Sequence, residues 1–225
     1  MGGPLVSRIP AARDDSGEGG SAAGRERTYA GKTRRQRRSE RQRQMLDAGL
    51  QLFGTRGYRR TTIEQLCSEA GVGLRAFYQE FGSRDALFRA VYDDVATTAY
   101  AGVERELAAV RDDPSDVRLA TCIRLLLESV LVDPRRARVV SIESSALDER
   151  MDRHRNDTMK RFAALIADML DPAARAVVGD PTLWSLMVGG ALNEIVISRI
   201  VSPDARPLPD LAAEVAATWV RTIQP

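Results

Sequence analysis

The chain has 225 residues, of which 44% are hydrophobic and 28% are charged, and its formal net charge is +2. This composition can bury a substantial core, which excludes a chain that is disordered throughout and suits two small helical domains. The two cysteines, Cys67 and Cys122, lie in apolar helical patterns, and the start shows no secretory signal. We therefore expect a cytoplasmic protein without a disulfide.

Charge is distributed unevenly along the chain. Residues 1–60 hold 14 Lys and Arg against 6 Asp and Glu, so the remaining residues are acidic on balance. A basic N-terminal part followed by an acidic body favours a nucleic-acid-binding surface joined to a body that does not contact phosphate.

Residues 1–33 are rich in Gly, Ala, Ser and charge and have no apolar period, which predicts a disordered tail. The run KTRRQRRSERQR at 32–43 then leads into an apolar stripe from Met45 to Phe53, which predicts a helix. Its arginines are either the solvated end of that helix or an arm that contacts DNA phosphates or the minor groove, and we favour the arm. The predicted arm residues are Arg34, Arg35, Arg37 and Arg38.

The segment 61–88, TTIEQLCSEAGVGLRAFYQEFGSRDALF, has the pattern of a helix, a glycine-bounded turn and a second short helix. The first helix has an apolar stripe at i, i+3, i+4 and i+7, formed by Ile63, Leu66, Cys67 and Ala70. Either Thr61 or Thr62 can begin it with a capping box, and Gly71 can take the left-handed conformation that ends it. Such a pair of helices can place the second one in a groove of duplex DNA.

This segment resembles the DNA-binding region of the tetracycline-repressor (TetR) family of regulators. The resemblance runs from about Arg41 to Val91 and rests on TTIEQLCSEAGV, Phe77, Tyr78, Phe81, Ser83-Arg84-Asp85 and Leu87. It implies an all-α fold with a three-helix helix-turn-helix domain at 34–83 and a helical ligand-binding and dimerisation domain at 84–225. The sequence departs from the family pattern at Cys67, Gly73, Arg75 and Arg84.

The second helix of the motif, about Leu74 to Glu80, is expected to recognise bases. If its aromatic residues turn inward, the exposed arginine can pair with guanine, the glutamine with adenine, and the alanine can contact a thymine methyl group. The resemblance adds Leu74 to these three residues. The predicted base-contacting residues are therefore Leu74, Arg75, Ala76 and Gln79. Glu80 is expected either to pair with an arginine or to tune sequence choice by repulsion.

Phosphate contacts are expected from positions that match the family and from helix starts. The predicted phosphate-contacting residues are Thr61, Thr62, Gly73, Tyr78 and Arg84. Each has a simpler alternative: the threonines can act only as caps, Tyr78 as a core aromatic, and Arg84 as the partner of a surface carboxylate.

Further helices are expected at about 84–110, 116–132, 134–145, 147–170, 181–201 and 208–220. The helix at 181–201 is apolar on nearly every side, which requires burial all round. Polar residues interrupt it at Asn193, Glu194, Ser198 and Arg199, so we set a membrane span aside.

The last two helices carry much apolar surface. By the resemblance they form half of a four-helix interface with a second copy of the chain, and the alternative is that both complete the monomer core. The predicted interface residues are Met187, Ala191, Ile195, Leu211, Val215 and Trp219. A homodimer of this kind would bind a palindromic operator in double-stranded DNA, with its two recognition helices in successive major grooves.

The resemblance also implies a small, largely apolar effector in the helical body. The candidate pocket residues are Tyr92, Leu127, Phe162, Trp184 and Met187, each of which could instead be ordinary core. Glu143 and Glu194 lie in apolar stretches, either as ion pairs at the edge of the core or as polar anchors in a ligand cavity.

Patterns typical of enzymes are missing. The single histidine, His154, lies among charged residues, and neither a metal-ligand spacing nor a nucleophile elbow is recognisable, so we expect no enzymatic activity, cofactor or metal. Residues 71–76, GVGLRA, fit a dinucleotide-binding fingerprint, but that fingerprint requires a preceding strand, and the sequence predicts a helix there. The prediction is a ligand-responsive repressor; the alternatives are a helical interaction module without DNA binding and, less favoured, a Rossmann oxidoreductase.

Overall fold

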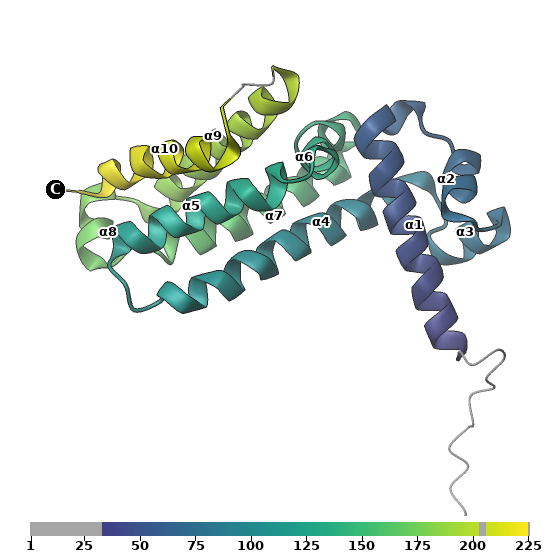
Figure 1. Ribbon diagram of the computed structural model, residues 1–225, viewed down its shortest axis with the longest axis horizontal. Helices are drawn as coiled ribbons and strands as arrows, with labels where there is room; N and C mark the ends of the chain where they lie inside the picture. Colours follow the sequence, from purple (N-terminus) through teal and green to yellow (C-terminus); the bar gives the residue numbers. More distant parts are fainter. Residues whose placement is uncertain (1–32, 203–205, 225) are drawn as a thin grey trace, which may run out of the picture. The chain divides into compact units, whose positions relative to one another are not determined.

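The computed structural model describes residues 33–202 and 206–224 of the chain. Every regular element in these residues is a helix, which confirms the predicted all-α fold (Figure 1). The α-helices are α1 (Arg34–Arg56), α2 (Ile63–Ala70), α3 (Leu74–Glu80), α4 (Arg84–Leu107), α5 (Ser115–Leu131), α6 (Pro134–Ser141), α7 (Glu149–Ala167), α8 (Pro172–Val178), α9 (Pro181–Val201) and α10 (Leu208–Val220). The predicted tail lies outside the described residues except for Thr33.

The chain divides into two compact units, residues 1–37 and residues 38–225. The division falls in α1, so the described part of the first unit is only the beginning of that helix. There the Gln36 side chain accepts from the Thr33 N–H at 2.8 Å, and Thr33 Oγ1 accepts from the Gln36 N–H at 3.1 Å, which caps the helix. The predicted domain boundary at residue 83 stays a prediction.

Thr62, rather than Thr61, begins α2. Its Oγ1 accepts from the Gln65 N–H at 3.3 Å, and Gln65 Oε1 accepts from the Thr62 N–H at 3.0 Å, so the capping box is complete. At the other end Gly71 has φ 64° and ψ 30°, the left-handed conformation that ends a helix at little cost in glycine. The residues before Gly71 are therefore a helix and not a strand, and the Rossmann alternative is wrong.

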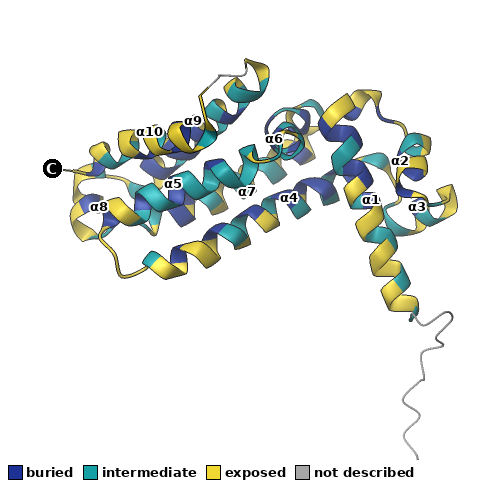
Figure 2. Ribbon diagram, viewed as in Figure 1, coloured by how far each residue is buried: buried dark blue, intermediate teal, exposed yellow. Residues whose placement is uncertain are grey.

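Two clusters of buried hydrophobic residues form the core, and α4 contributes to both. In the first cluster the rings of Phe53, Tyr58 and Phe88 pack against one another with centroids 5.2 to 5.8 Å apart. The second cluster lies among α4, α5, α7, α9 and α10 and includes Leu119 and Ile166, which are fully buried. Figure 2 shows buried residues along α4 and α5, whereas exposed residues are frequent on α10.

Helix α6 packs closely against the end of α1. A Cβ atom added to Gly54 in α1 would lie 2.5 Å from the Cβ of Arg135 and 2.7 Å from its Cα, so only glycine permits this approach. Beside this contact Arg135 Nη1 donates to Gln51 Oε1 at 2.6 Å. Helix α1 and the helices that follow α4 therefore meet at α6.

Among the described residues one helix, α9, is long and apolar enough to cross a membrane by length and composition. It packs against α6 and α7, but only 33% of its apolar window is buried, so the expected burial on all sides is not seen in the described residues of the single chain. At Gly189 the approach to α7 is close, because an added Cβ would lie 2.9 Å from the Sδ atom of Met159.

Candidate DNA-binding surface and ligand cavity

The short helix α3 buries one aromatic residue and exposes the side chains expected to recognise bases. Phe77 is fully buried, and its ring packs edge-to-face on Tyr78 with centroids 5.5 Å apart. This orientation leaves Arg75 and Gln79 exposed and Leu74 46% exposed. Ala76, the fourth predicted base-contacting residue, is half-buried. The predicted base-contacting residues thus lie on one short helix whose buried side is fixed by an aromatic anchor.

Three of the predicted phosphate-contacting residues lie at the surface around α3. Thr62 and Gly73 are exposed at the first ends of α2 and α3, where backbone N–H groups can face an anion. Tyr78 is 54% exposed and has a hydroxyl that can reach solvent.

Thr61 does not fit its predicted role. It is fully buried, and its hydroxyl donates to the Gly57 carbonyl at 2.9 Å, so no part of it can reach a phosphate. Arg84 makes internal contacts: its Nη1 donates to the Thr61 carbonyl at 2.8 Å, and its guanidinium lies 4.2 Å from the centroid of the Tyr58 ring. These contacts orient Arg84 while leaving it partly exposed.

Glu80 pairs with arginines, which was one of the two alternatives expected for it. Its carboxylate accepts from Arg38 Nε at 2.8 Å, from Gln42 Nε2 at 2.9 Å and from Arg41 Nη2 at 3.5 Å. Only 6% of the Glu80 side chain is exposed, so these donors compensate most of a buried charge. Arg38, predicted to belong to a DNA arm, therefore links α1 to α3; the other arm residues, Arg34, Arg35 and Arg37, lie in the first unit.

Glu143 is also an ion pair at the edge of the core. The buried carboxylate accepts from Arg138 Nε at 3.0 Å and from the backbone N–H of Tyr58 at 2.8 Å. It therefore connects the turn after α1 to the short 3₁₀ helix η3 (Glu143–Ala146) that follows α6. Glu194, for which the same two roles were open, is exposed and lines no part of the cavity.

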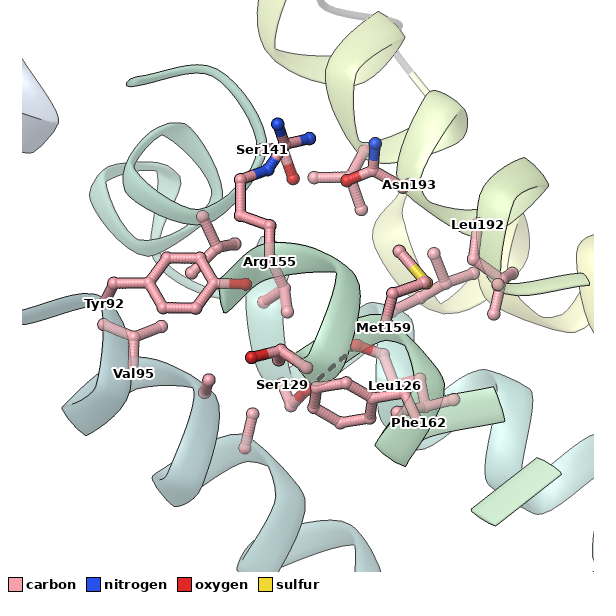
Figure 3. A pocket seen from close by; sticks show the side chains of 18 of the residues that line it. Tyr92, Val95, Leu126, Ser129, Ser141, Arg155, Met159, Phe162, Leu192 and Asn193 are labelled. Atoms are coloured by element: carbon pink, nitrogen blue, oxygen red, sulfur yellow. Dashed lines mark hydrogen bonds between the residues drawn. The ribbon is translucent and has the colours of Figure 1, made fainter. Parts of the chain in front are cut away.

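A cavity of about 350 Å³ lies among α4, α5, α6, α7 and α9 (Figure 3). Three of the predicted pocket residues, Tyr92, Leu127 and Phe162, line it. Burial raises the pKa of the Tyr92 phenol, and its contact with Thr158 lowers it in part. The volume is at the small end of the range for ligand pockets, about 300 to 1,000 Å³.

Two predicted pocket residues lie elsewhere on α9. Trp184 is buried against Trp219 of α10, with ring centroids 5.9 Å apart, and Met187 is 54% exposed on the outer side of the helix. Neither lines the cavity, because α9 turns Gly189, Leu192 and Val196 toward it instead. Trp184 and Met187 are therefore wrong as pocket residues.

Several lining residues were missed by sequence reasoning. Arg155, Ser141 and Asn193 are polar residues of the lining, and Met159 is an apolar one. A signal was present for two of them, because Arg155 and Met159 continue the helical spacing that leads to Phe162. The charged neighbours of Arg155 nevertheless favoured a solvated helix face.

The predicted dimer residues divide between surface and core. Met187 is exposed, together with Leu183 one turn earlier, whereas Ala191, Ile195, Val215 and Trp219 are half-buried. Leu211 is buried within the monomer, so it is not available to a partner.

The described residues thus contain a capped helix, a turn at a left-handed glycine and a short exposed helix, the arrangement of a helix-turn-helix DNA-binding protein. Residues 45–91 match the family model described as bacterial regulatory proteins, tetR family. This stretch of the chain is therefore similar to the TetR family, as its sequence predicts.

The chain is also similar to single proteins, to one in sequence and to two solved structures in fold. The HTH-type transcriptional activator FasR of Mycolicibacterium smegmatis is 31% identical over 83 residues, which are 37% of this chain and only 38% of that protein. The fatty acid degradation regulator FadR of Bacillus halodurans is 17% identical with a TM-score of 0.69, over 80% of this chain and 94% of that one. FadR of Bacillus subtilis, solved in complex with stearoyl-CoA, is 18% identical with a TM-score of 0.68, over 81% and 99% of the two chains.

Proposed function

We propose that the protein is a homodimeric transcriptional repressor that binds a palindromic operator and is released by a small effector. The observation that carries this proposal is the exposed face of α3, where Arg75, Tyr78 and Gln79 surround the buried Phe77. A guanidinium and an amide on one helix can read guanine and adenine in the major groove, and the phenol can hold a phosphate.

Pairing of two chains would set the distance between their two α3 helices. The exposed Leu183 and Met187 on α9, with the half-buried Val215 and Trp219 on α10, form an apolar face that supports a twofold interface with a second copy. Two α3 helices related in this way would enter successive major grooves about 34 to 36 Å apart. Such a protein acts in the cytoplasm, where its DNA is.

The cavity supports regulation by a ligand. Val140 and Ser141 of α6 line it, and the same helix packs on Gly54 of α1. A ligand that displaces this wall would favour a different placement of the DNA-binding helices, which requires only different affinities for the two states. The complex of Bacillus subtilis FadR with stearoyl-CoA is a relative of the same fold that binds a ligand with a long apolar part.

The test is DNA binding by the purified chain. A site selected from a random duplex library is titrated with wild type, Arg75→Ala and the exposed control Arg153→Ala. Arg75→Ala should lose about 1 to 3 kcal/mol at the selected site and relax choice at one base pair, whereas the control should change neither. Binding without sequence preference, or without dependence on salt, would refute the proposal.

Activation is a second candidate, since the relative FasR is named an activator. The position of the operator relative to the promoter decides between repression and activation. An operator that overlaps the promoter supports repression by occlusion, and an operator upstream of the promoter supports activation. A transcription assay with the selected site placed in both positions separates them.

A further inference from the structure

Arg155 is a charged residue on an otherwise apolar stripe of α7. Seven residues of this helix line the cavity, and four of them, Arg155, Met159, Phe162 and Ile166, are spaced at i, i+4, i+7 and i+11. The other three, Asp152, Asn156 and Thr158, are polar. Because an α-helix has 3.6 residues per turn, the spacing of the first four places them on one face. One wall of the cavity therefore begins with a cation and continues with apolar side chains.

Other polar groups gather at the same end of the cavity. Figure 3 shows the guanidinium of Arg155 at the end where Ser141 and Asn193 lie, with Leu126 and Phe162 at the opposite end. Ser141 comes from α6 and Asn193 from α9, so three helices bring hydrogen-bonding groups together. The lining from α4 is apolar apart from the hydroxyl of Tyr92, whereas α7 adds the polar side chains of Asp152, Asn156 and Thr158.

The guanidinium of Arg155 has little compensation from the described residues. Its Nη1 lies 3.4 Å from Oδ1 of Asp152, whose side chain is 62% exposed, and such a long, solvated contact is weak. Only 29% of the Arg155 side chain is exposed, and a guanidinium has five N–H donors. A partly buried cation with donors to spare favours an anion beside it.

The volume of the cavity gives the approximate size of the ligand part that it can enclose. If a group the size of a water molecule occupies about 30 Å³, the cavity of about 350 Å³ holds about a dozen non-hydrogen atoms. From Arg155 to Ile166 the helix rises about 16 Å, which is long enough for an extended chain of that many atoms.

We propose that the effector is an amphiphilic carboxylic acid with an unbranched chain of about ten carbons, whose carboxylate binds Arg155 and Asn193 and whose chain lies along α7 toward Phe162. A planar guanidinium matches a carboxylate with two parallel hydrogen bonds, and the amide of Asn193 supplies a further donor. This inference rests on the proposed regulation by a ligand in this cavity, and it adds the chemical class of that ligand.

Binding of decanoate and of decanamide to the full chain, measured by calorimetry at pH 7.5, tests the proposal. The two probes have the same size and shape and differ in charge. Wild type should bind decanoate at least about tenfold more tightly, because a hydrogen bond to a charged group is worth more than a neutral one. Arg155→Gln should remove this preference and leave the affinity for decanamide unchanged, whereas Arg153→Gln, on the exposed side of α7, should keep it.

Two further variants distinguish a specific change in ligand binding from a general loss of folded protein. Arg155→Lys keeps the charge but not the planar fork, so it should retain part of the preference for decanoate. Ala99→Leu fills part of the apolar lining and should shift the best-bound acid from decanoate toward octanoate. An acid bound elsewhere on the surface would show no change of preferred chain length, and that result would overturn the proposal.

Release of the selected DNA site is measured in parallel, so that the two proposals can fail separately. Equal binding of both probes, together with release of DNA by both, would leave the regulatory function standing and refute the acid. Failure of both probes to bind also refutes the proposal that the effector is a carboxylic acid. The proposed function is then still tested by DNA binding of the unliganded protein.

Discussion

The carboxylate of Glu143 accepts a hydrogen bond from the backbone N–H of Tyr58 at 2.8 Å, which joins the helical body to the DNA-binding helices. The same carboxylate pairs with Arg138 at the end of α6. One buried side chain thus satisfies a main-chain donor on one side of the junction and a cation on the other.

Glu143→Ala should destabilise the protein by about 2 to 4 kcal/mol, because it leaves a buried N–H and a partly buried guanidinium without their acceptor. Glu143→Gln keeps an acceptor oxygen and should cost less. Urea unfolding followed by circular dichroism measures both. Glu149→Ala, at an exposed carboxylate of α7, is the control and should change stability by less than about 0.5 kcal/mol. Equal stability of the Glu143→Ala and Glu149→Ala variants would contradict the assigned role.

Two glycines in helices should respond in opposite directions to alanine. Gly54→Ala should cost about 1 to 3 kcal/mol, because the new methyl group would overlap backbone and Cβ atoms of Arg135. Gly102→Ala meets nothing within 4 Å and should stabilise α4 by up to about 1 kcal/mol. Thermal unfolding of the two variants gives the comparison. A Gly54→Ala protein as stable as wild type would show that α1 and α6 are not in close contact.

The pairing of Glu80 should appear in the dependence of stability on pH. Burial tends to raise the pKa of this carboxyl, but the hydrogen bond and charge of Arg38, with the hydrogen bonds of Gln42 and Arg41, hold the pKa below its ordinary value of 4.5. A pKa lowered by folding stabilises the protein above the pKa of the unfolded chain, and this stabilisation is lost as the pH falls through the folded value.

Wild type should therefore exceed Glu80→Gln in stability at pH 7, and the difference should shrink as the pH falls below about 4.5. Urea midpoints of both proteins between pH 7 and pH 3 provide the measurement. Other carboxylates titrate in the same range, so the difference between the two proteins, not the curve of either, is the relevant quantity. A difference that stays constant over this range argues against the pairing.

The proposed pairing of two chains predicts a sensitive position on α9. Met187→Glu would place an unpaired charge in the interface and should raise the dimer dissociation constant by at least about tenfold, since burying such a charge is costly. Val132→Glu, at an exposed apolar residue that ends α5, is the matched control. Sedimentation velocity over a range of concentrations reports the change. If both variants stay dimeric, the face around Met187 is not the interface.

Local signals in the sequence predicted most helices well. The glycine that ends α2 and the Asp180-Pro181 start of α9 each act within a few residues, so they can be read without knowledge of the fold. The sequence leaves the cap of α2 open between Thr61 and Thr62, and the structure shows Thr62. The seven-residue α8 was missed, although Asp171-Pro172 gives it the same kind of start.

The ligand cavity was harder to predict, because its residues come from five helices. Helix α9 is apolar on nearly every side, so its sequence cannot tell the side of Leu192, which lines the cavity, from the outer side of Met187. Arg155 was missed because most of its sequence neighbours are charged. In such a stretch the sequence does not distinguish one arginine that faces the cavity from those that face solvent. Periodicity gives the spacing of a helical face but not what that face contacts.

Helix α4 contributes to both hydrophobic clusters, which has a consequence for preparing the DNA-binding helices alone. Cutting the chain after α3 would remove Leu87, Phe88 and Val91, which close the hydrophobic cluster beneath α1 and α2. A fragment that ends there should be unable to fold, and heating the intact protein should give one cooperative transition instead of two separate ones.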